Sequence, residues 1–207
     1  MKVVSNKNNI IHLEFPSFKE ITMTMGRPQE FYESGYKHLR NKVFTLEDFL
    51  DTFTNDDGDV SYYKSWAGFN VPGNKMEEFF KKFDLTKRED KLRKLINRLV
   101  KKGTYYIIAT KAGDTPTIEH EVVHATFYLN AEYRKAALKL VKQLPPAVYD
   151  PIKKTLIDMG YAGAVIDDEV NAYLSTASPA YLKKRFGFSP DASILKSFKQ
   201  VAKDFTQ

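Results

Sequence analysis

The sequence contains no cysteine, and only four of its 207 residues are histidine. Disulfide bonds and thiolate metal ligands are therefore excluded, and any metal site must use imidazole and carboxylate groups. The sequence also lacks an apolar run long enough to span a bilayer, and its first residues lack the apolar core of a signal peptide. We therefore expect a soluble protein of a reducing compartment, the cytoplasm.

Internal repeats and low-complexity tracts are absent too, whereas positive charge is in excess. The net charge of +6 and the pI near 9.2 mean that nucleic acid has to be considered as a partner. The strongest basic segment covers residues 87–102, where Thr86 and Glu89 predict a capping box and Gly103 the end of a helix. An apolar stripe favours a solvated outer face for this helix over a phosphate-binding surface. No zinc-finger spacing or glycine-rich phosphate loop accompanies it, so nucleic acid is not the expected partner.

Two of the four histidines lie in the stretch His120-Glu121-Val122-Val123-His124. On a helix, a spacing of four residues puts both imidazoles on one face, where they can bind one zinc ion while Glu121 points at a zinc-bound water. The alternative is a pair of core or surface histidines on an ordinary amphipathic helix. The stretch therefore predicts a zinc site, provided that its surroundings agree.

The residues around this HExxH motif predict a helix. Thr115 and Pro116 are typical of an N-cap and a first helical position. Apolar residues then recur at helical spacing, at Ile118, Val122, Ala125 and Leu129. The two residues between Glu121 and His124 are apolar, as expected for a helix buried beneath a cleft.

A catalytic zinc normally has three protein ligands and an open position for water, so a third ligand is required. The other two histidines lie far upstream, whereas the acidic cluster Asp167-Asp168-Glu169 opens a later apolar helix. Such a cluster also complements the helix dipole as an N-terminal cap. We interpret Asp167 or Asp168 as the cap and Glu169 as the third ligand.

A HExxH motif followed some tens of residues later by a glutamate on a second helix resembles the gluzincin group of zinc metallopeptidases. The second motif of that group is commonly Glu-x-x-x-Asp or Glu-x-x-Ala-Asp, and here it stands as Glu169-x-x-Ala172-Tyr173. Tyr173 takes the place of an aspartate that often orients a ligand histidine, which leaves the three ligands intact. The resemblance covers about residues 104–177. The metzincin pattern fits poorly, because no third histidine follows His124 closely.

This resemblance implies a zinc-dependent metalloendopeptidase of protein or peptide substrates. His120, His124 and Glu169 would bind the zinc, and Glu121 would be the general base. Three residues near in sequence are candidates for stabilising the oxyanion: Tyr161, Tyr173 and Arg185. A catalytically inactive zincin-like binding or structural protein is the alternative, and a metal-free nucleic-acid-binding protein is a third interpretation.

The order of elements indicates a mixed α+β, zincin-like fold with a helix-rich C-terminal half. Alternating apolar residues predict strands over residues 10–15 and 21–25, and a β-branched run predicts another over residues 105–110, before the HExxH helix. An extended peptide can pair along an edge of such a sheet. Further helices are predicted over residues 45–53, from 74 onward, and over 131–144, 151–159, 179–186 and 190–205.

We expect one domain over residues 1–207, with an N-terminal lobe over about residues 1–84 and the metal-binding core over about residues 85–207. The hydrophobic content of 43% suffices for a sizeable core. The segment from Trp66 to Asn70 resembles small uncharacterised proteins of tailed phages, which would place the protein in the cytoplasm of the host.

Overall fold

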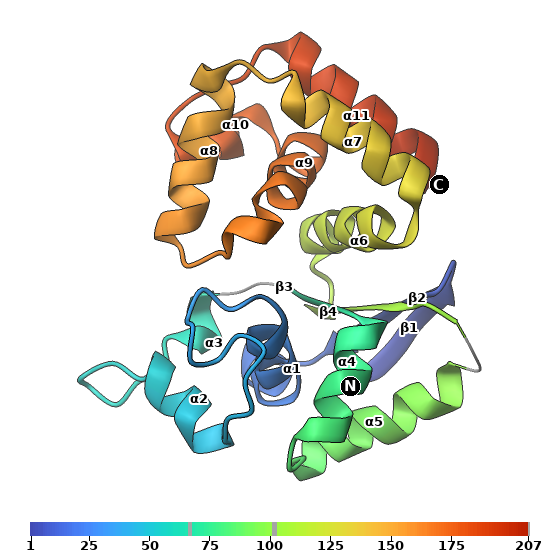
Figure 1. Cartoon of the computed structure of the whole chain (residues 1–207), viewed down its shortest axis with the longest axis vertical. Helices are drawn as coiled ribbons and strands as arrows, with labels where there is room; N and C mark the ends of the chain where they lie inside the picture. The colour runs from blue at the N-terminus through green and yellow to red at the C-terminus, as the bar shows by residue number, and fades with distance from the viewer. Residues whose placement is uncertain (66–67, 101–102, 207) are drawn as a thin grey trace. The chain divides into compact units, whose positions relative to one another are not determined.

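The computed structural model describes residues 1–65, 68–100 and 103–206 (Figure 1). Contacts within the chain divide it into two compact units, Met1–Thr117 and Ile118–Gln207. The boundary falls in the HExxH helix, later than the lobe boundary expected near residue 84. The single-domain assignment stays a prediction.

Two features of the sequence lie partly outside the described residues. They are residues 66–67 of the phage-like segment and residues 101–102 at the end of the basic segment. Within the ranges that the structure describes, no helix is both long enough and apolar enough to cross a membrane.

The first unit contains a four-stranded sheet with the strand order β1-β2-β4-β3. Its strands are β1 (Lys2–Lys7), β2 (Ile10–Phe15), β3 (Gly68–Pro72) and β4 (Tyr106–Lys111). β2 and β4 are parallel, and the other two neighbouring pairs are antiparallel. The strands predicted over residues 10–15 and 105–110 are confirmed to within one residue. Because β4 lies between β2 and β3, the strand before the HExxH helix is not an edge of the sheet.

The helices of this unit lie on one side of the sheet, which α1 and α4 contact directly (Figure 1). They are α1 (Phe18–Glu33), α2 (Leu46–Phe53), α3 (Tyr62–Ser65), α4 (Gly73–Lys82) and α5 (Lys87–Leu99). α1 contacts β2, β3 and β4 as well as α3, α4 and α5. The core combines strand aliphatics with helix aromatics: Ile11, Leu13, Val71, Ile107, Phe31, Phe49 and Phe79. The helix predicted over residues 45–53 is confirmed, with the capping box of Thr45 at its start.

The strand predicted over residues 21–25 is wrong, because these residues lie in α1. Ser17 caps the helix by accepting a hydrogen bond from the Glu20 amide N–H at 3.2 Å. Ile21 and Met25 are fully buried at a spacing of four residues, which is a helical repeat. A five-residue window does not separate the two periods, and the cap favours the helix.

The capping box predicted at Thr86 and Glu89 is confirmed, and Glu89 has a second partner that the sequence did not reveal. Arg27 of α1 donates hydrogen bonds from Nε to Glu89 Oε1 at 2.9 Å and from Nη2 to Oε2. Both side chains are almost fully buried, at 4% and 2% exposed. Removing one partner would leave an uncompensated buried charge, so the pair fixes α1 against α5.

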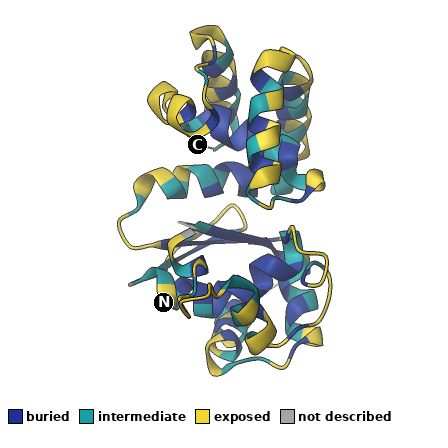
Figure 2. Ribbon diagram, turned by 90° about the vertical axis from the view of Figure 1, so that its left-hand side faces the viewer, coloured by how far each residue is buried: buried dark blue, intermediate teal, exposed yellow. Residues whose placement is uncertain are grey.

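The described part of the second unit is built from helices. They are α6 (Thr115–Leu129), which starts just before the unit boundary, α7 (Ala131–Lys142), α8 (Pro146–Asp158), the short η1 (Gly163–Val165), α9 (Ile166–Thr176), α10 (Pro179–Phe186) and α11 (Ala192–Thr206). α9 contacts α7, α8 and α11, and therefore lies at the centre of this unit. Figure 2 shows buried residues along one side of these helices and exposed residues along the other.

The predicted start of α11, at Pro190, is two residues early, since the helix begins at Ala192, and two other predicted starts are displaced as well. α8 begins at Pro146, with Pro145 as its N-cap, so Pro151 lies inside the helix and not at its start. α4 begins at Gly73, one residue before the predicted cap Asn74. In both cases a proline just upstream fixes a φ angle compatible with entry into a helix, and a polar residue downstream drew the prediction away from it.

Candidate metal centre

α6 and α9 bring together three side chains that can hold a metal ion: His120, His124 and Glu169. The Nε2 atoms of the two imidazoles are 3.2 Å apart. The Glu169 carboxylate lies 3.5 Å from Nε2 of His124 through Oε1, and 3.7 Å from Nε2 of His120 through Oε2. These are the three residues predicted as ligands, and their binding of a metal stays a prediction.

The separations between these atoms are close to those of a metal site. Ligand atoms at about 2.0 to 2.1 Å from a tetrahedral zinc ion lie about 3.3 to 3.4 Å from one another. The two Nε2 atoms are 3.2 Å apart, but each faces a different oxygen of Glu169, and one ligand atom from each residue gives a group within 4.8 Å. One ion can therefore contact both imidazoles and the carboxylate once the Glu169 side chain turns one oxygen toward both nitrogens.

Thr176, at the end of α9, determines which nitrogen of His120 carries the proton. Its hydroxyl donates to the Ala172 carbonyl oxygen at 2.7 Å, so the proton of the hydroxyl is already used. The Thr176 oxygen also lies 3.3 Å from Nδ1 of His120 and must accept a hydrogen bond there. Nδ1 of His120 therefore carries a proton, and the lone pair of Nε2 is directed at the Glu169 carboxylate.

Asp168 has the same effect on His124. Its Oδ2 lies 2.9 Å from Nδ1 of His124, and a carboxylate accepts hydrogen bonds without donating any. Nδ1 of His124 is thus the donor, and its Nε2 faces the other two ligand atoms. A carboxylate bound to the outer nitrogen is the usual way in which a ligand histidine is held in place.

The prediction that Asp167 or Asp168 caps the second helix is wrong. The N-cap is Val165, which has no capping side chain, and both acidic residues lie inside the first turn of α9. Asp167 accepts a hydrogen bond from the Tyr149 hydroxyl at 2.8 Å. No pattern in the sequence singled out Asp168 as the partner of His124, because spacing along the chain does not show which side chains of α9 face α6.

Buried negative charge surrounds the imidazoles. Burial alone would lower the pKa of His124, but the carboxylates of Asp168 and Glu169 outweigh burial and raise this pKa well above its usual value. Burial would raise the pKa of Glu169, but the His124 imidazole lowers it below its usual range. Oε2 of Glu169 is buried, and among the described residues it has no hydrogen-bond donor. Once the His124 proton is displaced, a cation between the Glu169 oxygen and the two nitrogen lone pairs would stabilise this arrangement.

Glu121, the predicted general base, is buried on the same helix as the two histidines. Its charge is one of those that raise the pKa of His124, so the carboxylate lies within electrostatic range of the ligands. The group of three residues that can hold a metal does not include it. The role of Glu121 as a general base stays a prediction.

Tyr173 packs its ring against His120, with ring centroids 4.8 Å apart. Its ring also contacts those of Tyr181 and Phe186. Burial raises the pKa of Tyr173, and its hydroxyl interacts with Tyr161 and with the charge of Arg185. The three residues named as candidates for oxyanion stabilisation therefore lie in one neighbourhood, next to a predicted ligand.

Comparison with protein-family models, with curated proteins and with solved structures found no significant match to this chain.

Proposed function

We propose that this protein is a zinc-dependent metallopeptidase that hydrolyses peptide bonds within protein or peptide substrates. The observation that carries the proposal is the convergence of two imidazole nitrogens and one carboxylate on a buried point, with each imidazole oriented through Nδ1. Structural zinc sites usually have four protein ligands, whereas catalytic sites have three and a position for water. The three-residue group found among the described residues fits the catalytic class.

The donor set favours zinc over other common cations. Magnesium and calcium prefer sites made of oxygen ligands, and two of the three side chains here offer nitrogen. Manganese and iron accept such ligands but bind them more weakly than zinc does. When bound, zinc would lower the pKa of its water toward neutrality and polarise the peptide carbonyl as a Lewis acid.

In this proposal Glu121 transfers the proton. Its carboxylate accepts a proton from the attacking water while the water oxygen bonds to the carbonyl carbon. It then donates that proton to the amide nitrogen as the carbon–nitrogen bond breaks, so a carboxylic acid and an amine leave. His120 and His124 keep their Nδ1 protons throughout, held by Thr176 and Asp168.

Glu121→Gln tests the proposal, because the amide keeps the size of the side chain but cannot accept the proton. Zinc content and fold should stay unchanged, while peptide turnover should fall at least ~10²-fold, as is typical for loss of a general base. The matched control is Glu119→Gln, an exposed glutamate on the same helix, which should turn over like the parent. Turnover is measured on a broad peptide panel with zinc content confirmed equal.

Equal turnover by the parent and Glu121→Gln would contradict the assigned role of Glu121. Stoichiometric zinc without turnover in the parent across the whole panel would instead favour a zincin-like binding protein. The two failures are distinct, because the first leaves an active enzyme and the second leaves none.

A further inference from the structure

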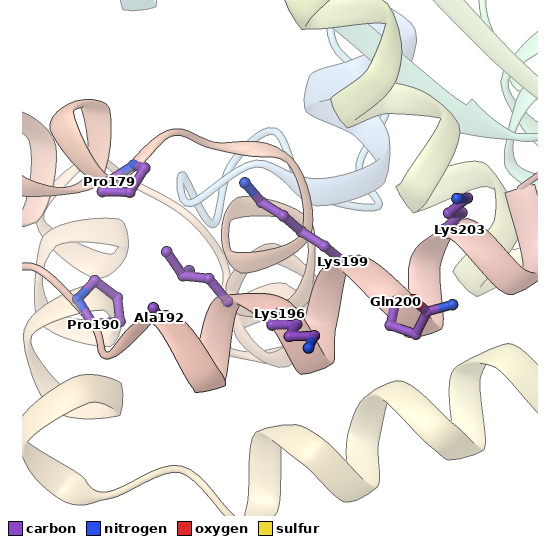
Figure 3. Close-up of a pocket in the computed structure, with 8 residues that line it drawn as sticks. Pro179, Pro190, Ala192, Lys196, Lys199, Gln200 and Lys203 are labelled. Carbon is purple, nitrogen blue, oxygen red and sulfur yellow. The ribbon is translucent and has the colours of Figure 1, made fainter.

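A groove of about 550 Å³ runs along α11 in the second unit (Figure 3). One end is apolar and is formed by Pro179, Pro190, Ala192 and Leu195. The remainder follows α11 and is lined by Lys196, Lys199, Gln200 and Lys203. Figure 3 shows Pro179, Pro190 and Ala192 together at one end, with Lys199, Gln200 and Lys203 following along the helix.

The three lysines form an uncompensated row of positive charge. They are spaced by three and four residues, which places them on one face of α11, and all three are exposed. Ion pairs of lysine in the described part of the chain involve other residues, namely Lys64, Lys75, Lys82, Lys94 and Lys154. Asp204, next to Lys203 in sequence, accepts a hydrogen bond from Gln200 at 2.7 Å. Like charges at these spacings destabilise a helix, so helix stability does not account for the row.

The basic helix α5 differs from α11 in this respect. Asp90 pairs with Arg93 at 2.6 Å and with Lys94 at 2.7 Å, and Arg88 pairs with Glu20 at 3.0 Å. Much of the charge on α5 is therefore balanced by carboxylates within the first unit. On α11 no ion pair to Lys196, Lys199 or Lys203 is found among the described residues, so these charges are available to carboxylates of another molecule.

We propose that the groove along α11 docks an acidic amphipathic helix of a partner protein. Lys196 and Lys203 are seven residues apart, which is about 10 Å along the helix axis. A helix laid beside α11 presents side chains at the same repeat, so its carboxylates would face the lysines. An apolar side chain of the partner would pack on the exposed Pro179 and Ala192, beside the lysine stems.

The chemistry of the groove favours a helix over single-stranded nucleic acid. Proteins bind single strands by stacking bases on aromatic rings and guanidinium groups. The described residues that line this groove are proline, alanine, leucine, lysine and glutamine, and they offer no such platform. Carboxylates and short apolar side chains match this lining better than bases do.

The test is a binding titration of the full-length, metal-free protein with a fluorescein-labelled amphipathic helical peptide. The peptide carries glutamate at positions i, i+3 and i+7, and its twin carries glutamine there. The groove variant is Lys196→Gln/Lys199→Gln/Lys203→Gln. The matched control removes three exposed lysines elsewhere, as Lys81→Gln/Lys87→Gln/Lys91→Gln, with the same change of net charge.

The acidic peptide should bind the parent and the control variant equally, and should lose at least about tenfold in affinity for the groove variant, because three facing charges are removed. Its glutamine twin should bind weakly to all three proteins. Equal losses in both variants would contradict the proposal, as would equal binding of the two peptides or no binding of either. Preferential competition by a single-stranded oligonucleotide would also overturn it. No zinc is present, so the result is independent of the proposed peptidase activity.

Discussion

Replacing Asp168 tests whether the orientation of His124 determines metal affinity. A zinc-bound His124 must carry its proton on Nδ1, which lies 2.9 Å from Oδ2 of Asp168. Asp168→Ala removes this acceptor and leaves a buried N–H without a partner when zinc is bound. In the metal-free variant a neutral His124 escapes that penalty, because its single proton can then move to Nε2 and face Glu169, 3.5 Å away.

The expected magnitude follows from the cost of the unpaired group. A buried donor without its partner costs about 1 to 3 kcal/mol, which weakens zinc binding by roughly 5- to 150-fold. This range includes the 10- to 100-fold loss that is typical of removing the partner of a ligand histidine. Asp168→Asn should lose less than Asp168→Ala, because an amide oxygen can still accept the hydrogen bond without the charge.

The assay is competition for zinc against a chromophoric chelator at neutral pH, with the fold checked by circular dichroism. Asp167→Ala is the matched control, since Asp167 is the neighbouring acid but binds Tyr149 instead. It should keep the affinity of the parent. Parent-like affinity for Asp168→Ala, or a larger loss for Asp167→Ala, would refute the reasoning.

Two further predictions concern pH and the first unit. Because the pKa of His124 is raised above its usual value of 6.5, metal-free protein holds that proton at neutral pH, and zinc has to displace it. Zinc affinity should therefore rise with pH, by up to about tenfold per pH unit, until the pH exceeds the raised pKa of His124. Calorimetry in buffers of different ionisation heat measures the proton that zinc releases. An affinity independent of pH would count against the metal site. The same protonation stabilises the metal-free fold fully below pH 6.5, and this stabilisation is lost as the pH rises through the raised value. Arg27→Met should lower the free energy of unfolding, measured in urea, by about 3 to 5 kcal/mol, because Glu89 stays buried without its partner. Arg88→Met breaks an exposed ion pair and should change the free energy of unfolding little. Similar losses in both variants would contradict the stabilising role of the buried Arg27–Glu89 pair.

The sequence predicted most elements whose capping and apolar spacing agree. β2, α5 and the HExxH helix are examples, since each combines a regular apolar period with a recognisable boundary. It failed at Ile21–Met25, where five alternating residues were too few to distinguish a strand from a buried helix. The Arg27–Glu89 pair could not be predicted at all, because it depends on how two helices distant in sequence pack together.

The grouping of His120, His124 and Glu169 was accessible for a similar reason. His120 and His124 are fixed relative to each other by the helix repeat alone, and Glu169 stands at the start of a second helix. The partners that orient the imidazoles were not accessible. Thr176 and Asp168 act through positions on α9 that face α6, and one-dimensional spacing does not show which side of a helix meets another.

Metal analysis of the purified protein tests whether His120, His124 and Glu169 together form a metal centre. The parent, reconstituted with zinc and passed through a desalting column, should retain one zinc ion per chain. Each of His120→Ala, His124→Ala and Glu169→Ala should lose that zinc, because each leaves two of the three ligands. Retention of zinc in all three variants, or a parent that binds none, would contradict the metal centre on which the proposed function depends.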